Sequence, residues 1–477
     1  MNDRNILELR GLYKSAFYGP QMGYAETRSS KSLVIKPSSL EECKEIINYC
    51  SQENIKICCR GGGFSYGDMI LNTEELILDI SSMSNILSWN PEKGEMSLEP
   101  GVSFASIFKI SLLDNWSLTS CPGGMDVTIG GAISNNVHGK DAWKNGNFGN
   151  QVTSLEILLS NSKLLIIEKN DPIFKAVIGG MGLFGLIVKI NIQLQKIPSP
   201  FVQIRTQLAK DISETVDLLE LRKEDSDFSV AWVDAFATGD SIGRGYVSSA
   251  SWVVGDLKTS KEDLEKSLTK PKYIFGFLPS KPIWFVGRVF FKPVVLKFLN
   301  KLHYLLAKKT FAKQGKSSKP VLFTDYNFMH NKIPDIKEVY RPYGFFEFEP
   351  LLPKDSGKES LKGLLKLCQK YKSESLLCGI KSHKSDDFLI SFEGRGYSIG
   401  IDIQVSGRTK NNIDNFVNAI SEFTIENKGK IYLAKDENLS KISFQKMYPQ
   451  YKDFLKLKRN LDPKSLFISD MFKRLLS

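Results

Sequence analysis

The sequence has no apolar stretch long enough to cross a membrane and no secretory leader. No run of about 18 uncharged apolar residues occurs in its 477 positions. Residues 1–17 carry charges but lack the apolar core of a signal peptide. We therefore expect neither export by a standard signal nor a membrane span.

Cysteine and histidine are scarce and scattered. The seven cysteines include no C-x-x-C pair, and none of the four histidines lies four residues from another. A tetrahedral zinc site needs such clusters, so no bound metal is expected. Scattered thiols of odd number suit a reducing compartment, which predicts a cytoplasmic protein.

Acidic residues are missing from one long stretch. None occurs between Glu265 and Asp325, and the window 255–320 holds fifteen basic residues against four acidic ones. The formal net charge of the chain is +11, so this window accounts for all of the excess. Aromatic residues are interleaved with its cations: Tyr273, Phe275, Phe277, Trp284, Phe285, Phe290, Phe291, Phe298 and Tyr304. The window fits a solvated lid, a nucleic-acid groove or a dock for anionic lipid.

The rest of the composition indicates a folded protein of mixed structure. Apolar residues make up 42% and charged residues 25%, which excludes global disorder. Strand and helix periodicities alternate over residues 30–194. Strands are expected at 32–36, 55–59, 75–80 and 95–100, and a helix capped by Ser39 over 40–52. This alternation predicts an α+β fold.

The composition changes after residues 197–200, which predicts a second domain. Strand-like segments at 228–236 and 343–352 flank the basic window. Prolines at 271, 279, 282 and 293 exclude one long helix before Pro293, whereas 294–309 fits an amphipathic helix. A short helix is expected within 465–477.

Glycine clusters interrupt the first region at several points. Gly180 to Gly185 match G-x-G-x-x-G, the pattern of a nicotinamide-binding turn. That turn needs a following helix, whereas 186–194 is β-branched and mostly alternating, which predicts a strand. We therefore do not expect a Rossmann site there.

The cluster at 60–68 is the most informative. It follows an expected strand, and its successive backbone N–H groups can form a concave anion nest, with the Ser65 hydroxyl as an added donor. A second glycine-rich wall at 121–140 would let a flat ring lie against the backbone, with Thr128, Asn135 and Asn136 as hydrogen-bonding groups. His138 lies between glycine-bearing turns, which favours a role in the site. A tight hairpin turn is the plain alternative at 60–68.

These segments resemble a known family. Residues 60–68, 122–140, 146–150 and 179–185 are similar to the FAD-binding segments of the vanillyl-alcohol oxidase and p-cresol methylhydroxylase superfamily. Within it the chain resembles the decaprenylphosphoryl-β-D-ribose 2-oxidases, flavoproteins of a bacterial ribose-to-arabinose epimerisation. Further similar segments follow in order at 229–234, 344–349, 397–405, 432–436, 447–449 and 462–475.

The resemblance implies a fold and an activity. The expected fold is α+β, with a two-domain FAD-binding arrangement of the p-cresol methylhydroxylase type and a substrate cap built on an antiparallel sheet. Residues 1–197 and 426–477 would hold FAD, and 198–425, with the basic aromatic segment 266–320, would form the cap. The expected reaction moves hydride from a secondary alcohol of a polyprenyl-phosphate pentose to flavin N5, which yields a keto sugar.

The resemblance also implies site residues. Those expected to bind FAD are Arg60, Gly61, Gly62, Gly63, Phe64, Ser65, Tyr66, Pro122, Gly123, Gly124, Thr128, Gly130, Gly131, Asn135, Asn136, His138, Gly139, Ile187, Tyr432 and Lys435. Those expected at the substrate are Lys140, Ser229, Trp232, Glu347, Glu349, Ser398 and Gly400. Lys435, His138 and Asp402, in that order, are the candidate catalytic bases. An ammonium at Lys435 would also stabilise negative charge on the reduced flavin.

Several positions depart from the family pattern. Phe64 stands where many members attach FAD through a histidine, so non-covalent FAD is expected. Glu347 and Glu349 replace glutamines, Ser398 replaces an asparagine and Gly400 replaces a cysteine. Ala142 and Trp143 replace a histidine pair. Two added carboxylates change the pocket charge and leave the exact sugar open; they could also take part in proton transfer.

Partners and alternatives follow from the same resemblance. A short-chain dehydrogenase that reduces the keto sugar is the expected protein partner. Because the substrate class is lipid-linked, we favour the anionic membrane surface as the role of the basic window, at the inner face of the cell membrane, and expect no nucleic acid. The alternatives are a soluble aldonolactone or alditol oxidase and a non-catalytic basic lipid- or nucleic-acid-binding protein.

Overall fold

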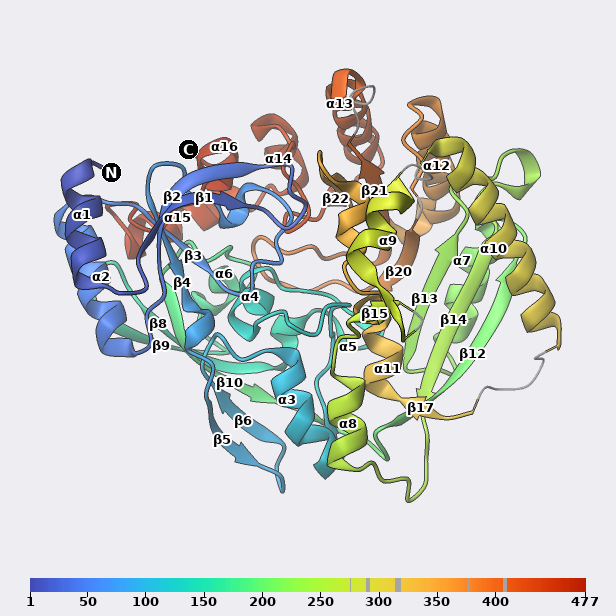
Figure 1. Ribbon diagram of the computed structural model, residues 1–477, viewed down its shortest axis with the longest axis horizontal. Coiled ribbons are helices and arrows are strands. Elements are labelled where there is room, and N and C mark those ends of the chain that lie inside the picture. Colours follow the sequence, from blue (N-terminus) through green and yellow to red (C-terminus); the bar gives the residue numbers. More distant parts are fainter. Residues whose placement is uncertain (275, 289–291, 314–318, 376, 406–409) are drawn as a thin grey trace.

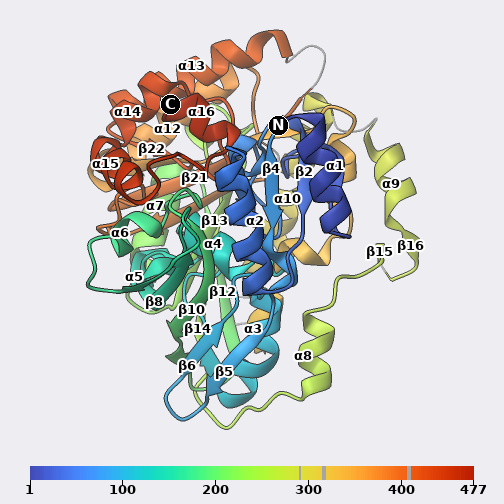
Figure 2. The same cartoon turned by 90° about the vertical axis from the view of Figure 1, so that its left-hand side faces the viewer.

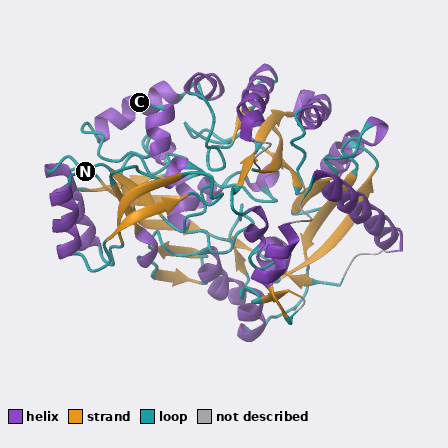
Figure 3. Cartoon of the chain, turned by 45° about the horizontal axis from the view of Figure 1, so that its top comes forward, coloured by secondary structure: helices purple, strands orange, loops and turns teal. Residues whose placement is uncertain are grey.

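The strands gather in two groups, one at each side of the computed structural model (Figure 1). The model describes residues 1–274, 276–288, 292–313, 319–375, 377–405 and 410–477. Phe275, Phe290 and Phe291 of the basic aromatic segment lie outside these residues. Figure 3 shows most helices on the outside of the two groups of strands.

The first group contains two sheets from the N-terminal region. One has the order β1(Phe17–Met22), β2(Ser29–Ile35), β4(Leu76–Asp79), β3(Ile57–Arg60), parallel except between β1 and β2. The other is antiparallel, in the order β5(Ile86–Asn90), β6(Glu95–Leu98), β10(Leu186–Gln193), β8(Val152–Leu158), β9(Leu164–Glu168). A small ladder joins β7(Trp116–Ser117) to β11(Gln195–Lys196).

The helices of this region are α1(Asp3–Leu12), α2(Leu40–Gln52), α3(Phe104–Ser111), α4(Ile129–Ser134), α5(Ala142–Asn145) and α6(Phe174–Val177). Each expected strand of the region overlaps one of the strands observed. The Ser39 side chain accepts a hydrogen bond from the Glu42 amide and caps α2, as the sequence predicts. Gly185 leads into the strand β10 and not into a helix, which excludes the nicotinamide-binding turn.

The second group is one antiparallel sheet. Its order is β17(Val321–Leu322), β12(Phe201–Ala209), β14(Gly245–Trp252), β13(Phe228–Val233), β20(Cys378–His383), β21(Gly396–Gln404), β19(Pro350–Pro353), β22(Lys430–Ile431), and β18(Phe345–Phe348) also pairs with β21. The helices α7(Ile212–Arg222), α12(Gly357–Lys370) and α13(Lys410–Glu426) belong to this region. An antiparallel sheet after residue 198 agrees with the predicted fold class, whereas the division into domains at 198 and 426 stays a prediction.

The basic aromatic segment 266–320 and the residues beside it form separate elements. They are α8(Lys261–Ser267), β15(Tyr273–Ile274), β16(Leu278–Pro279), α9(Ser280–Gly287), α10(Pro293–Lys313) and α11(Phe323–Asn327). The helix predicted at 294–309 is thus present as α10. In Figure 2, α8, β15, β16 and α9 stand at the outer edge of the molecule. No helix of the described ranges is long and apolar enough to span a bilayer.

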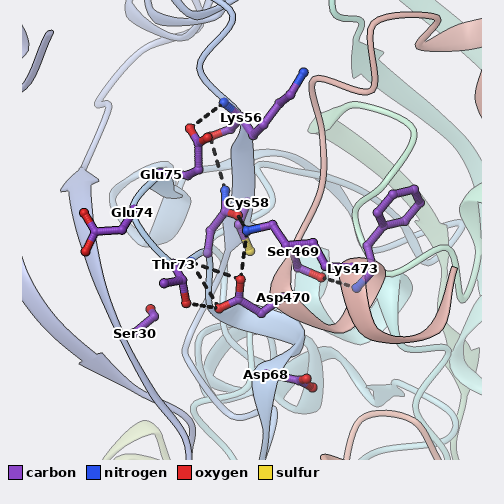
Figure 4. A network of polar contacts seen from close by, with 12 residues as sticks. Ser30, Lys56, Cys58, Asp68, Thr73, Glu74, Glu75, Ser469, Asp470 and Lys473 are labelled. Carbon is purple, nitrogen blue, oxygen red and sulfur yellow. Dashed lines mark hydrogen bonds and ion pairs between the residues drawn. The ribbon is translucent and has the colours of Figure 1, made fainter. Parts of the chain in front are cut away.

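The chain ends by returning to the first sheet. The elements α14(Lys441–Met447), α15(Tyr451–Leu461) and α16(Asp470–Leu475) follow β22. Phe467 forms a parallel bridge with Ile57 of β3, and Asp470 accepts hydrogen bonds from the Thr73 amide and hydroxyl (Figure 4). The C-terminal segment therefore lies beside the strand that leads into the glycine loop 60–68.

Candidate active site

The loop after β3 presents free backbone donors. Gly63 has φ of +75°, a conformation that side chains rarely adopt. The N–H groups of Gly63, Phe64 and Ser65 have no hydrogen-bond partner within the described part of the chain. Because three successive amides are open, the loop can bind an anion, as its sequence predicts.

The first two glycine segments meet at Thr128. Its hydroxyl accepts hydrogen bonds from the Gly62 amide at 3.3 Å and from the Gly131 amide at 3.4 Å, and so caps α4. A Cβ at Gly61 would lie 2.2 Å from that hydroxyl. Glycine is therefore required here by the packing of one segment on the other.

The other two glycine segments converge on Asn136. Its side-chain oxygen accepts a hydrogen bond from the Gly149 amide at 2.9 Å, and a Cβ at Gly179 would lie 3.6 Å from the Asn136 Cβ. A Cβ at Gly182 would contact Cys59 of β3. The four glycine segments that the sequence singles out thus form one continuous region.

A cavity lies between this region and the segment after β22. It is lined by Met69, Asn135, Gly179, Met181, Ile390, Phe392, Tyr432, Leu433, Ala434 and Tyr448. The Tyr432 hydroxyl donates to the Asn135 carbonyl, whereas the buried side-chain oxygen of Asn135 has no partner among the described residues. The cavity therefore offers apolar and aromatic walls with an open acceptor.

Lys435 lies at the centre of a charged cluster beside this cavity. Its ammonium forms ion pairs with Glu347 and, at 2.8 Å, with Glu349. Burial alone would lower the pKa of Lys435, but the two carboxylates outweigh it and raise that pKa. Burial would likewise raise the pKa of Glu349, yet Lys435 and His138 hold it well below its usual range. Lys435 is therefore charged and Glu349 ionised.

A second carboxyl group faces Glu347 across the sheet. Asp402 of β21 pairs with Glu347 of β18 in the strand register. Burial, and then the neighbouring Glu347 charge, raise the pKa of Asp402 well above its usual range. Burial and the neighbouring charge therefore favour the protonated form of Asp402.

Gly400 makes room for the carboxylate of Glu347. A Cβ at Gly400 would lie only 3.2 Å from Glu347 Oε1. The two departures from the family pattern, glycine at 400 and glutamate at 347, are thus sterically linked. A Cβ at 400 would require the carboxylate to move by a few tenths of an ångström.

A hydrogen-bonded chain extends from Glu349 to two histidines. Ser398 donates to Glu349 at 2.9 Å and lies 2.8 Å from His383 Nε2, while His138 Nε2 lies 3.3 Å from Glu349. Burial lowers the pKa of both imidazoles, so both are neutral. Since Glu349 can only accept, Nε2 of His138 carries the proton. Its buried Nδ1 is therefore a lone pair with no partner among the described residues.

Sequence reasoning missed Lys381, His383 and Tyr24. Lys381 and His383 are two residues apart on β20, on the face that carries Ser398, and Lys381 lies 3.8 Å from Glu349. Tyr24 packs its ring 5.1 Å from that of Tyr66, over which the Lys435 ammonium lies at 5.6 Å. The alternation within 378–383 was the available signal for the β20 pair.

Three predicted substrate residues do not join the cluster. Lys140 donates to the carbonyls of Tyr326 and Asn327, and burial lowers its pKa to about 7. Trp232 stacks on Tyr246 and is covered by His303 of α10, its ring centroid 4.6 Å away. Ser229 is buried, and its amide donates to the Lys140 carbonyl.

The remaining predicted flavin residues lie along the glycine walls. Arg60 donates to Gln21, and the Phe64 ring lies 5.4 Å from that of Tyr24. Ile187 is buried in the core on β10. The others occupy the two converging segments, namely Ser65, Tyr66, Pro122, Gly123, Gly124, Gly130 and Gly139.

These residues fit the cofactor that the sequence suggests. The cavity beside Asn135, at about 10 Å³, admits about one water molecule. The open amides of 63–65 suit a diphosphate, and the unpartnered Asn135 oxygen can accept a hydrogen bond from the edge of a ring system. The loop 60–68, the segment 122–140 and Tyr432 would hold it. No cluster of three or more metal-ligating side chains occurs within the described ranges.

Comparison with family models agrees with this assignment. Residues 32–168 match a model described as "FAD binding domain". Residues 295–475 match a model described as "D-arabinono-1,4-lactone oxidase". Both matches support an oxidoreductase that binds FAD.

Comparison with individual proteins covers nearly the whole chain. It is 25% identical to decaprenylphosphoryl-beta-D-ribose oxidase of Mycolicibacterium smegmatis, over 95% of this chain and 96% of the relative. It is 22% identical to L-gulonolactone oxidase of Bos taurus, over 92% and 93% of the two chains. D-lactate dehydrogenase of Archaeoglobus fulgidus is 27% identical over 34% of this chain. The resemblance drawn from the residues is confirmed.

Proposed function

We propose that this chain, an FAD-dependent oxidoreductase, oxidises a secondary alcohol of a polyprenyl-phosphate pentose to a ketone. Because the chain is an FAD-dependent oxidoreductase, the alternative of a non-catalytic binding protein is excluded. Similarity to the ribose oxidase over nearly the full length of both chains supports the substrate class. The observation that carries the proposal is the cluster of Lys435, Glu349 and His138 beside the flavin-binding walls.

The chemistry divides between charge and proton transfer. FAD, when bound, accepts the hydride from the substrate carbon. Lys435 is held charged by two carboxylates, so it supplies electrostatic stabilisation and cannot take a proton. His138 is neutral with a free Nδ1, which makes it the preferred acceptor for the substrate hydroxyl proton. Asp402, already protonated, would serve as a hydrogen-bond donor.

We infer that FAD is bound without a covalent link. Phe64 has no nucleophilic atom, and its ring packs against Tyr24. Acid precipitation of the purified yellow protein should release the flavin to the supernatant, where its absorbance is measured. Yellow colour that stays with the pellet would contradict non-covalent binding.

The product implies a second enzyme. A ketone formed from the sugar can be reduced on the opposite face, which inverts the carbon. A short-chain dehydrogenase with a nicotinamide cofactor is the class that would perform this reduction, and we propose it as a partner. The electron acceptor that returns FAD to its oxidised form is oxygen, a quinone or another oxidant.

An aldonolactone oxidase is the second candidate. The match of residues 295–475 to the D-arabinono-1,4-lactone oxidase model favours it, as does the similarity to L-gulonolactone oxidase. Such an enzyme would act on free sugar lactones and would have no need of a lipid.

Anaerobic flavin bleaching separates the two candidates. The holoenzyme is mixed with a prenyl-phosphate pentose of short chain, with free pentoses and with aldonolactones, and the flavin absorbance is followed by stopped flow. We expect the prenyl-phosphate pentose to bleach the flavin at least about 100-fold more efficiently, since remote binding groups contribute to catalysis. Faster bleaching by a lactone would overturn the proposal.

A further inference from the structure

The basic aromatic segment exposes apolar side chains on two helices. On α9 and the turn before it, Phe277, Phe285 and Val286 are 72%, 66% and 61% exposed. On α10, Val294 and Phe298 are 81% and 63% exposed, and Leu302 and Leu305 extend the same stripe at helical spacing. Apolar side chains this exposed on two helices mark a candidate interaction surface.

The other face of α10 packs against the protein. Leu296, Asn300 and Ala307 are buried, and the Tyr304 hydroxyl donates to the Ala209 carbonyl. Figure 1 shows α9 and α10 on the same side of the molecule, in front of the strands β12–β14, β20 and β21. The exposed stripe is thus the face of α10 that the fold leaves uncovered.

Cations flank the stripe, and the segment that carries it has no acidic residue of its own. Lys297, Lys301, Lys308 and Lys309 are exposed on α10, and Lys281 on α9. The sequence has no acidic residue from 266 to 324. A surface that is both apolar and cationic complements an anionic bilayer, where cations meet headgroups and apolar side chains enter the interface.

Helix α9 connects this surface to the active site. Trp284 packs against the cluster of Ala25, Tyr340 and Phe345, which Tyr24 and Tyr66 also contact. The Trp284 indole donates to the Pro334 carbonyl at 2.7 Å. Tyr66 in turn lies under the Lys435 ammonium. One face of α9 therefore packs on a cluster that also contacts Tyr66, while Phe285 and Val286 are exposed to solvent.

We propose that the exposed faces of α9 and α10 are a docking surface for an anionic lipid bilayer, and that docking brings the cluster shared by Trp284 and Tyr66 near the membrane. The docking itself needs no substrate. Only its purpose, delivery of a lipid-linked sugar, rests on the proposed function. If the surface docks in this way, the protein is bound to the face of the membrane without crossing it.

Vesicle flotation tests the docking surface. The holoenzyme is floated with vesicles of phosphatidylcholine, with or without about one third phosphatidylglycerol. We expect at least about ten-fold more protein on the anionic vesicles, and release as salt shortens the screening length from about 10 Å at 0.1 M to about 3 Å at 1 M. Equal flotation with both vesicles, or none, would overturn the proposal.

Paired variants locate the surface. Phe285→Ser with Phe298→Ser should lower flotation at least about ten-fold, because two exposed aromatic anchors are lost. Leu7→Ser with Ile166→Ser removes side chains that are 68% and 61% exposed on α1 and β9, and should leave flotation unchanged. Equal loss in both pairs, or in neither, would refute the assignment to α9 and α10.

DNA binding and flavin bleaching separate the bilayer from a nucleic-acid partner, and docking from catalysis. Binding of single-stranded DNA without flotation would identify the surface as a nucleic-acid site and reject the bilayer. Flavin bleaching by the water-soluble short-chain substrate should be the same in the Phe285→Ser, Phe298→Ser variant as in wild type. Failure of every prenyl-phosphate substrate would reject the proposed function while flotation still reports on docking.

Discussion

Lys435→Met should reduce both stability and turnover, and the two losses should be separable. The substitution leaves the buried carboxylates of Glu347 and Glu349 without their shared cation. Removing one partner of a buried ion pair destabilises by about 3–5 kcal/mol. Loss of a charge that stabilises the transition state lowers the rate by about 100-fold or more.

A compensated variant separates the two effects. In Lys435→Met with Glu347→Gln and Glu349→Gln, no carboxylate is left unpaired, so most of the free energy of unfolding in urea should return. The rate of anaerobic flavin bleaching should stay low. A triple variant that bleaches at nearly the wild-type rate would show that Lys435 is only structural.

The chain offers a matched control for Lys435. The side chain of Lys430 has the same exposed fraction, 20%, and pairs with Glu393, whose side chain is 18% exposed. Lys430→Met should lower the free energy of unfolding without lowering the bleaching rate. A comparable loss of rate in both variants would mean that general destabilisation explains the result.

Arg474→Met should destabilise the protein and weaken FAD binding. The Arg474 guanidinium donates two hydrogen bonds of 2.8 Å to Asp68 and one of 3.0 Å to Asp436. Asp68 is the last residue of the glycine loop 60–68, and Asp436 follows Lys435. Arg474 thereby joins the loop with the open amides to the segment that carries the active-site cation. We expect a loss of about 3 kcal/mol in stability and a Kd for FAD raised at least about ten-fold.

The loss should depend on pH with a defined sign. Burial raises the pKa of Asp68 and Arg474 opposes that rise, so the pKa should rise further in the variant. The folded variant then keeps a proton that the unfolded chain releases above its ordinary pKa of about 4, and stability falls as pH rises through that value. The deficit measured in urea should thus be larger at pH 7 than at pH 4.

Arg244 provides the control for this variant. Its side chain is 20% exposed and pairs with the buried Asp234, against 21% for Arg474 with Asp436. Arg244→Met removes the same kind of ion pair from the strand region around β13 and β14. It should lower stability without changing the Kd for FAD measured by titration.

Helix α16 has a second anchor in the Arg474 variant. Figure 4 shows that Asp470 holds the start of α16 to Thr73, so α16 keeps this anchor when Arg474 is changed.

The glycine segments show which parts of the fold short-range sequence patterns predict. The strand before 60–68, the strand after Gly185 and the N-cap at Ser39 follow from short-range patterns and are present as predicted. The repeated glycine clusters in the sequence predicted that the four segments converge. Hydrogen bonds accepted by the side chains of Thr128 and Asn136 join them in the structure. Similarity to a family added FAD and the position of Lys435.

The ionisation states of the side chains in the charged cluster could not be predicted from the sequence. Lys435 headed the predicted bases, yet its two ion pairs keep it protonated, and the free lone pair belongs to His138. Lys381 and His383 reach the pocket because β20 pairs with β21 in one register. Trp232 was expected at the substrate, but His303 of α10 covers it.

What the sequence by itself determined is the backbone of the cofactor site and the charge of one exposed segment, because turns, caps and strand alternation depend on neighbours a few residues away. What only the tertiary structure decided is which charges meet. Glu347, Asp402 and Lys435 are brought together by strand register and chain return across tens of residues. Neighbouring carboxylates then keep Lys435 charged, and burial raises the pKa of Asp402. No spacing along the chain encodes that outcome.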